Sequence, residues 1–206
     1  MARLRVVYPQ DTILFITSSV VENLPFVPNK VVNAILEGIL AWALFMFGQE
    51  LIGYCFMANH LHLMLRVTDP DRLSDFIGHI KSESATAINR LLGRESHKVW
   101  CDRFDAPIVL TEDKVFEKLA YIYLNPAKAR LVNSIDEYPG VSSWSAFIKN
   151  KPSKKVRWIK NSTIRKLNKL EMTLSEQIEE VKKLKKVNDI DFDLRITPYA
   201  YTETFP

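Results

Sequence analysis

The feature that most constrains the fold is a pair of apolar segments separated by only two residues. Residues 50–57 and 60–67 are short, apolar and rich in β-forming side chains, and Ala58 and Asn59 are the whole connection between them. Asn tolerates the left-handed backbone that tight turns need, so the two segments are predicted to form an antiparallel hairpin. A sheet built on this hairpin must find its remaining strands and its helical cover elsewhere in the chain.

Helical and strand-like segments alternate around this hairpin. Apolar residues at helical spacing predict long helices before and after it, and a β-branched run precedes them all. These segments are residues 12–18 for the strand and residues 31–47, 69–93 and 112–125 for the helices, with residues 99–110 as one more strand or a second hairpin. The order favours an α+β fold, with an antiparallel sheet and helices packed mainly on one face.

Asn125 and Pro126 are expected to end or kink the third of these helices. Pro has no backbone N–H, and Asn before Pro would cap a new turn over residues 127–131. Tyr121 lies four residues before Asn125, so both side chains could face the same side of the helix. Taken alone, each residue has a structural explanation, as a core tyrosine with a hydrogen-bonded hydroxyl and as a helix cap.

His60 and His62 are the residues that most suggest chemistry. Side chains at positions i and i+2 of a strand point to the same face, so both imidazoles point the same way. Their Cα atoms would be about 6.6 Å apart, close enough for the two rings to converge on one divalent ion. Two histidines on a solvated sheet face would give the same pattern. A metal site therefore needs a third ligand.

Charge divides the chain near residue 148. Residues 1–148 hold 14 Lys/Arg against 16 Asp/Glu, whereas residues 149–186 hold 13 against 4. We therefore expect a core domain over residues 1–148 and a basic C-terminal arm over residues 149–206, with an amphipathic helix at residues 174–187. Such an arm either follows nucleic-acid phosphates, because Lys and Arg release condensed counterions, or is a solvated helix face.

Membrane, secretory and disulfide-rich classes do not fit the sequence. The longest apolar run, residues 34–48, is about 15 residues long and carries Glu37, whereas a membrane span needs roughly 20 nearly uncharged residues. The N-terminus shows no secretory signal, and Cys55 and Cys101 lie far apart in the chain. We expect a cytoplasmic protein with reduced thiols and no membrane partner.

Five blocks, in the same order, resemble the REP-associated tyrosine transposases, a branch of the single-tyrosine HUH-nuclease (IS200-like) transposase family. The blocks are YCFMANHLHLML at residues 54–65, IKSESATAINR at 80–90, VWCDRF at 99–104, YIYLNPAKARLV at 121–132 and YPGVSSW at 138–144. The resemblance spans about residues 10–148 and implies the ferredoxin-like (RRM-like) HUH nuclease fold. The C-terminal arm lies outside it.

The resemblance implies an enzyme that nicks and joins single-stranded DNA at hairpin-bearing repeats. Tyr121 would attack the phosphorus and form a 5′-phosphotyrosine link, leaving a free 3′-OH. A divalent ion, Mg²⁺ or Mn²⁺, held by His60, His62 and Asn125 would polarise the scissile phosphate. The expected partner is single-stranded or hairpin DNA, bound by a monomer or a homodimer. The expected DNA-binding residues are Lys81, Arg90, Arg103, Lys128 and Arg130.

Three positions depart from the family pattern. Ala58 stands where Pro is usual, Cys101 where Gln is common and Arg130 where Gly is common. Ala58 only loosens a turn, whereas the other two lie near the expected DNA path and bear on substrate preference and activity. Two alternatives share some of these features: a domesticated relative that binds structured single-stranded DNA or RNA without cleaving it, and a plasmid replication initiator or relaxase. The histidine pair, Tyr121 and Asn125 together argue against the first, and the later blocks fit the transposase branch better than the second.

Overall fold

The predicted hairpin is the centre of a three-stranded antiparallel sheet. In a computed structural model of the chain, which describes residues 7–21, 26–167, 172–183 and 191–205, β2 (Glu50–Phe56) pairs with β3 (His60–Arg66). The Met57 amide donates to the carbonyl oxygen of His60 at 2.8 Å and closes the tight turn. β1 (Ile13–Ser19) pairs with the other edge of β3, so the strand order is β1-β3-β2.

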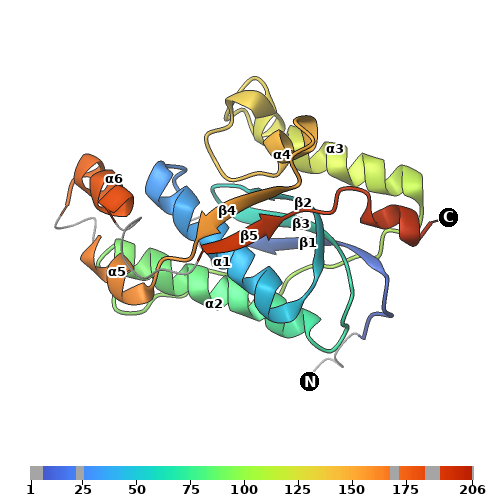
Figure 1. The fold of residues 1–206 in the computed structure, drawn as a ribbon, viewed down its shortest axis with the longest axis horizontal. Coiled ribbons are helices and arrows are strands. Elements are labelled where there is room, and N and C mark those ends of the chain that lie inside the picture. The colour runs from blue at the N-terminus through green and yellow to red at the C-terminus, as the bar shows by residue number, and fades with distance from the viewer. Residues whose placement is uncertain (1–6, 22–25, 168–171, 184–190, 206) are drawn as a thin grey trace.

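Long helices cover both faces of this sheet (Figure 1). α1 (Lys30–Phe47) and α2 (Leu73–Leu91) pack on the face that carries Leu14 and Leu63. α3 (Glu112–Lys128) packs on the opposite face, which carries Ile13 and Met64. The α+β class with an antiparallel sheet is confirmed, and α3 stands apart from the other two long helices.

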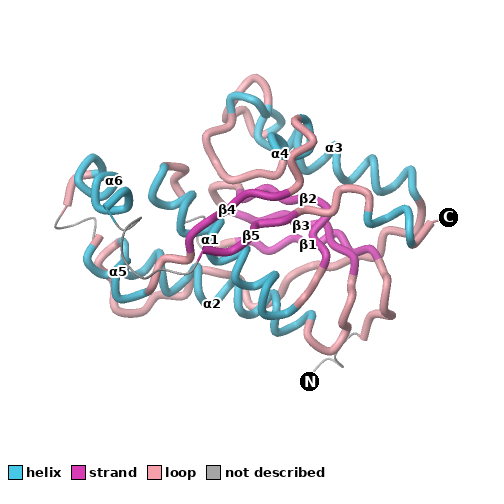
Figure 2. Tube along the Cα trace, in the orientation of Figure 1, coloured by secondary structure: helices cyan, strands magenta, loops and turns pink. Residues whose placement is uncertain are grey.

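The C-terminal arm folds back onto α1 and α2. β4 (Ser153–Arg157) and β5 (Asp191–Arg195) form a second antiparallel pair that packs on α1, and α5 (Asn161–Lys166) packs on α2. Figure 2 shows these two strands side by side, overlapping the three-stranded sheet in this view, and they form a sheet of their own. The arm also contains α6 (Leu174–Lys183), which matches the start of the predicted amphipathic helix, whereas residues 184–187 of that prediction lie outside the described residues. The remaining short elements are α4 (Trp144–Ile148) and the 3-10 helices Ile135–Glu137 and Ala200–Glu203.

The arm explains why α1 is apolar on nearly all sides. By length and hydropathy alone α1 could cross a membrane. Here it lies against α2 on one side and against β4 and β5 on another, and half of it is buried. A helix that is apolar all round suits such a buried position.

Gly38 sets how closely the arm approaches α1. A Cβ atom at this position would lie 2.3 Å from the carbonyl oxygen of Arg157, which is closer than any real Cβ contact. Gly inside a helix costs about 1 kcal/mol relative to Ala. The close packing of the β4 backbone on α1 therefore requires this glycine.

α3 does not end at Asn125, so of the predicted end or kink, the helix end is wrong. The helix continues through Pro126 to Lys128, although Pro126 has no N–H to donate to the carbonyl oxygen of Ile122. Asn125 and Pro126 are both buried, as is Ile122. Packing against the sheet thus outweighs a helix penalty of roughly 3 kcal/mol.

Other backbone segments cover both outer edges of the sheet. The amides of Phe15 and Thr17 on β1 donate to the carbonyl oxygens of Pro107 and Asp105. On β2, the Phe56 amide donates to the carbonyl oxygen of Val141, and the carbonyl oxygen of Leu51 accepts from the Thr197 amide. Within the described residues 99–110 there is no regular strand, only isolated bridges to β1, so neither the extra strand nor the second hairpin forms.

Candidate active site

β3 presents both histidines to the α3 face of the sheet. The centroids of the two rings are 4.5 Å apart, and His62 is buried while His60 is partly exposed. Thr17, directly opposite His62 on β1, holds Nδ1 of that ring with its hydroxyl at 3.0 Å. Asn59 holds Nδ1 of His60 through Oδ1 at 2.6 Å. Each ring therefore has its Nδ1 engaged and its Nε2 directed elsewhere.

The two Nε2 atoms converge on the side chain of Asn125. The amide nitrogen of Asn125 lies 2.7 Å from Nε2 of His62 and 3.3 Å from Nε2 of His60. An amide nitrogen can only donate, so both Nε2 atoms carry lone pairs. Burial lowers the pKa of both rings, that of His62 to about 3, with the neighbouring His60 adding to the effect. Both imidazoles are thus neutral at pH 7.

This arrangement fits a divalent cation. Neutral imidazoles whose Nδ1 is held by a neighbour are the form that binds metals. Turning the Asn125 amide over would bring Oδ1 toward the same point and give two nitrogen donors and one oxygen donor. Among the described residues, no group of three His, Cys, Asp or Glu side chains forms a metal site, so this one would depend on the asparagine.

Tyr121 lies beside the histidines on α3. Its ring meets the His62 ring edge-on, with centroids 5.3 Å apart, and the side chain is 40% exposed. It also meets the ring of Phe15, the β1 residue that stacks on His62 at 5.3 Å. The hydroxyl-bearing ring is therefore both near the histidines and open to solvent.

Tyr123 faces a different part of the protein. It is buried, and its hydroxyl is hydrogen-bonded to Oγ of Ser143 at 2.9 Å. Burial raises its pKa to about 12. It packs closely over β2, where a Cβ on Gly53 would lie 2.8 Å from Leu119 and 3.2 Å from the Tyr123 hydroxyl. This tyrosine fastens α3 to the sheet.

Lysines flank Tyr121 along the same side of α3. Lys118, Tyr121, Asn125 and Lys128 are spaced by three, four and three residues. The Lys128 ammonium lies 5.3 Å from the centre of the Tyr121 ring, and that of Lys118 lies 5.2 Å from the centre of the Phe15 ring. Lys118 is absent from the sequence prediction, although its spacing from Tyr121 was a readable signal.

Residues 25–122 match a family model described as "Transposase IS200 like". These residues belong to that family. Its members are typically tyrosine HUH nucleases, and the family generally uses a divalent metal. The matched segment includes both histidines and Tyr121, and ends three residues before Asn125.

One solved structure shares the fold of this chain, and a second is a weaker match. One is a REP-associated tyrosine transposase bound to a REP hairpin, with 18% sequence identity and a TM-score of 0.61, covering 72% of this chain and 86% of the other. Another, from Deinococcus radiodurans R1 and named as a candidate transposase, has 19% identity and a TM-score of 0.42 over 59% of this chain and 95% of the other. The search of curated proteins gave no match.

The other basic residues predicted to bind DNA lie on α2, on the segment that follows it and just after α3. Lys81 on α2 donates to the carbonyl oxygens of Cys101 and Asp102, so its ammonium is already hydrogen-bonded. Arg90 is at the end of α2 and is partly exposed, and Arg103 is exposed. Arg130, exposed just after α3, has a left-handed backbone with φ 57°. Of the five, only Lys128 contacts Tyr121.

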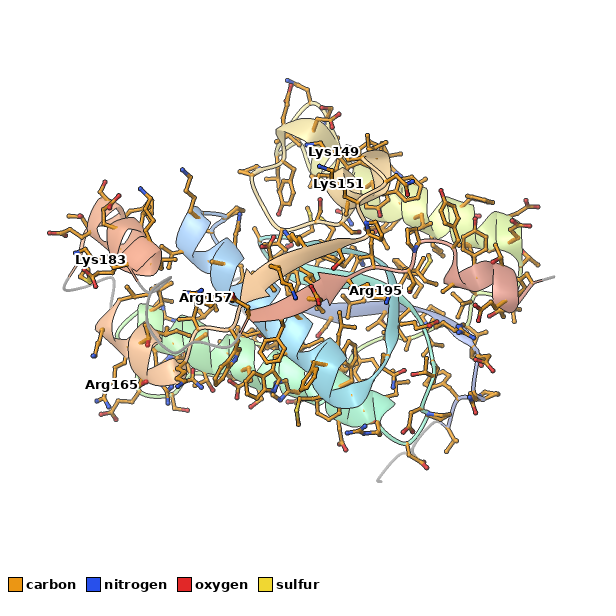
Figure 3. All side chains as sticks on the ribbon, in the orientation of Figure 1. Lys149, Lys151, Arg157, Arg165, Lys183 and Arg195 are labelled. Atoms are coloured by element: carbon orange, nitrogen blue, oxygen red, sulfur yellow. The ribbon has the colours of Figure 1, made fainter. Side chains whose placement is uncertain are left out.

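Much of the positive charge of the arm is paired with carboxylates. Among the described residues, the paired groups are Lys154 with Glu37, Lys155 with Asp193, Arg157 with Asp191, Lys182 with Glu179 and Lys183 with Glu180. Figure 3 shows the labelled basic residues spread from Lys149 and Lys151 near α4 to Arg165 and Lys183 at the far end of the arm. The described part of the arm therefore does not form one continuous basic surface.

Proposed function

We propose that this transposase cleaves and rejoins single-stranded DNA at hairpin-bearing repeats, with Tyr121 as the nucleophile. The observation that carries the proposal is the convergence of His60, His62 and Asn125 beside an exposed tyrosine. Each group alone has an ordinary structural role. Together they combine a cation site with a nucleophile on one face of the sheet.

The reaction exchanges one phosphodiester bond for another. A divalent ion such as Mg²⁺ or Mn²⁺, when held by the two histidines and Asn125, supplies Lewis-acid polarisation of the scissile phosphate. Tyr121 attacks the phosphorus, its phenolic proton leaves to solvent, and the bond from phosphorus to the 3′-oxygen breaks. The 3′-oxygen takes a proton from solvent. The phosphotyrosine bond that forms retains the energy needed for rejoining, so the exchange needs no ATP.

Charge and the fold of a relative support a DNA substrate. The solved relative with the higher TM-score is bound to a REP hairpin. We propose that Lys128 and Arg130 contact the strand near Tyr121, and that Lys81, Arg90 and Arg103 contact DNA farther away, on the α2 side. We also propose that residues 1–148 carry the chemistry and that residues 149–206 are an appended arm.

A covalent-adduct assay tests this proposal. The full chain is incubated with Mn²⁺ and end-labelled single-stranded DNA containing the hairpins that flank its own gene. We expect a protein–DNA adduct on denaturing gels, and peptide mapping should place the nucleotide on Tyr121. Chelator should abolish the adduct.

Two outcomes would contradict the proposal. An adduct on another residue would remove Tyr121 from its role. Tight binding of the hairpin DNA with no adduct at any Mn²⁺ or Mg²⁺ concentration would instead favour the domesticated, non-cleaving binder.

A further inference from the structure

An apolar cavity of about 220 Å³ opens beside the candidate active site, between the outer edge of β1 and α3. Phe15 and residues 107–110 form its apolar walls, and Lys114 and Lys118 of α3 stand at its side. Pockets for drug-sized ligands measure roughly 300–1,000 Å³. A cavity of this size suits a single ring system.

Phe15 links the cavity to the histidines and to Tyr121. Its ring lines the cavity, stacks on His62 with a 20° interplanar angle, and meets Tyr121 edge-on with centroids 5.9 Å apart. An occupant would therefore be one ring away from the nucleophile. That is the distance scale of neighbouring groups in one nucleotide chain.

Two large apolar side chains at the cavity are unusually open to solvent. Ile108 is 44% exposed and Leu110 is 73% exposed. Ile108 is bridged to Leu14 of β1, and Leu110 follows Val109, whose amide donates to the carbonyl oxygen of Ile13. Exposed apolar side chains that line a cavity are a typical ligand surface.

The charge around the cavity selects the class of occupant. Lys118 lies over Phe15 and Lys128 over Tyr121, and neither lysine forms an ion pair within the described part of the chain. Lys114 is paired with Glu117. A flat apolar ring flanked by negative charge matches both features, and single-stranded nucleic acid combines them by stacking its bases and neutralising its phosphates.

We propose that this cavity binds the nucleobase next to the phosphate that Tyr121 attacks, with Lys118 on the adjoining phosphate. The inference rests on the proposed function, which makes single-stranded DNA the ligand. It assigns Ile108 and Leu110 to substrate binding and Lys118 to phosphate contact. The protein would thus bind the single-stranded nucleotides at the cut directly, in addition to binding the hairpin.

An abasic scan of the substrate tests the proposal. Binding of the full chain to its gene-flanking hairpin DNA is measured in chelator, with each nucleotide around the cut made abasic in turn. In the wild type, one position beside the cut should lower affinity by roughly 5- to 150-fold, which is the range for losing one stacked base. In the double variant Ile108→Ala, Leu110→Ala, the intact DNA should bind more weakly and the same abasic change should have little further effect.

Matched variants separate the cavity from general effects. Ile148→Ala, at a 58% exposed position on α4, should behave like the wild type in the scan. Lys118→Ala should reduce the slope of log affinity against log salt for an oligothymidylate by about 0.7, while Lys166→Ala should not. Thermal melting checks that each variant is folded.

The outcomes of the two proposals can be told apart. The base-binding cavity alone would be overturned if each abasic change lowered DNA affinity equally in the wild type and in the double variant while the protein still formed the adduct. If the abasic effect disappears in the double variant but no adduct forms with the wild type, the base-binding cavity is kept and cleavage is rejected. A change in the sedimentation of the DNA-free protein on Ile108→Ala, Leu110→Ala would instead assign the cavity to a second copy of the chain.

Discussion

The two faces of the three-stranded sheet differ sharply in what they bury. The face toward α1 and α2 is mostly apolar, with Leu14, Ile16 and Leu63 fully buried and Ser18 as a buried polar residue. The face toward α3 mixes apolar residues with Thr17 and the two histidines. The same strands supply both faces, because alternate residues point in opposite directions. One sheet thus separates the apolar packing of the fold from the residues of the proposed chemistry.

The largest contrast is expected from a pair of tyrosine variants. Tyr121→Phe should reduce adduct formation by roughly 10⁴-fold or more, on the scale of losing a nucleophile, with DNA binding nearly unchanged. Tyr123→Phe should keep the adduct but lower the free energy of unfolding by about 1 kcal/mol, because the bond to Ser143 is lost. An adduct that persists in Tyr121→Phe and vanishes in Tyr123→Phe would reverse the assignment.

The next largest effect on the α3 face of the sheet is expected from removing a histidine. His60→Ala and His62→Ala should each lose metal-dependent cleavage by more than the 10- to 100-fold typical of losing an outer-shell partner. His62→Ala should also cost about 1–3 kcal/mol of stability, because Asn125 and Thr17 lose a buried partner. Cleavage rates in Mn²⁺ and in chelator measure the first effect, and urea unfolding the second. Wild-type cleavage by the double variant in chelator would end the metal-site proposal.

The apolar face should respond in the opposite way. Leu63→Ala, next to His62 in β3 but on the opposite face of the sheet, should lower the free energy of unfolding by about 2–5 kcal/mol. Below the melting temperature, cleavage per folded molecule should change little. A loss of cleavage without a loss of stability would show that the two faces are coupled.

Docking of the arm on α1 can be tested with two glycines. Gly38→Ala should destabilise the protein by about 1–3 kcal/mol, because the new methyl group overlaps the carbonyl oxygen of Arg157. Gly78→Ala on α2, where nothing lies within 4 Å, should instead stabilise it by about 0.5–1 kcal/mol. Urea unfolding measures both. A neutral Gly38→Ala would mean that the arm is not held firmly against α1.

The smallest effect is expected from the arm lysines near α4. Complete removal of residues 149–206 would also uncover α1, so point variants separate DNA binding from folding. If Lys149 and Lys151 contact phosphates, Lys149→Ala and Lys151→Ala should each reduce the salt slope of single-stranded DNA binding by about 0.7. Lys155→Ala, which removes a partner of Asp193, serves as the control. Unchanged slopes in both variants would exclude these lysines from DNA binding.

Local patterns were sufficient to predict the hairpin and which residues share one face of a strand or helix. The two-residue turn at Ala58 and Asn59 gave the hairpin, and the period of a strand gave the shared face of the histidines. The four-residue spacing of Tyr121 and Asn125 gave their shared side of α3. That these two elements face each other depended on the family resemblance, because no local signal encodes it.

Long-range packing accounts for what the sequence did not reveal. β4 contributes one buried residue, Val156, and pairs with a strand more than thirty residues later, so neither strand has a strong pattern of its own. The helix through Pro126 is held by burial against the sheet, which local propensity cannot register. The three-residue spacing of Lys118 from Tyr121 is a local signal, but its contact with Phe15 joins α3 to a distant strand and cannot be predicted from local sequence.

The covered edges of the sheet have a consequence for association. Residues 105–109 occupy the hydrogen-bonding groups of β1, and residues 141–143 with Thr197 occupy those of β2. Strand addition, by which an extended peptide or a second chain lengthens a sheet, needs a free edge. A partner therefore cannot add a strand to this three-stranded sheet, and the same covered edges protect it against aggregation.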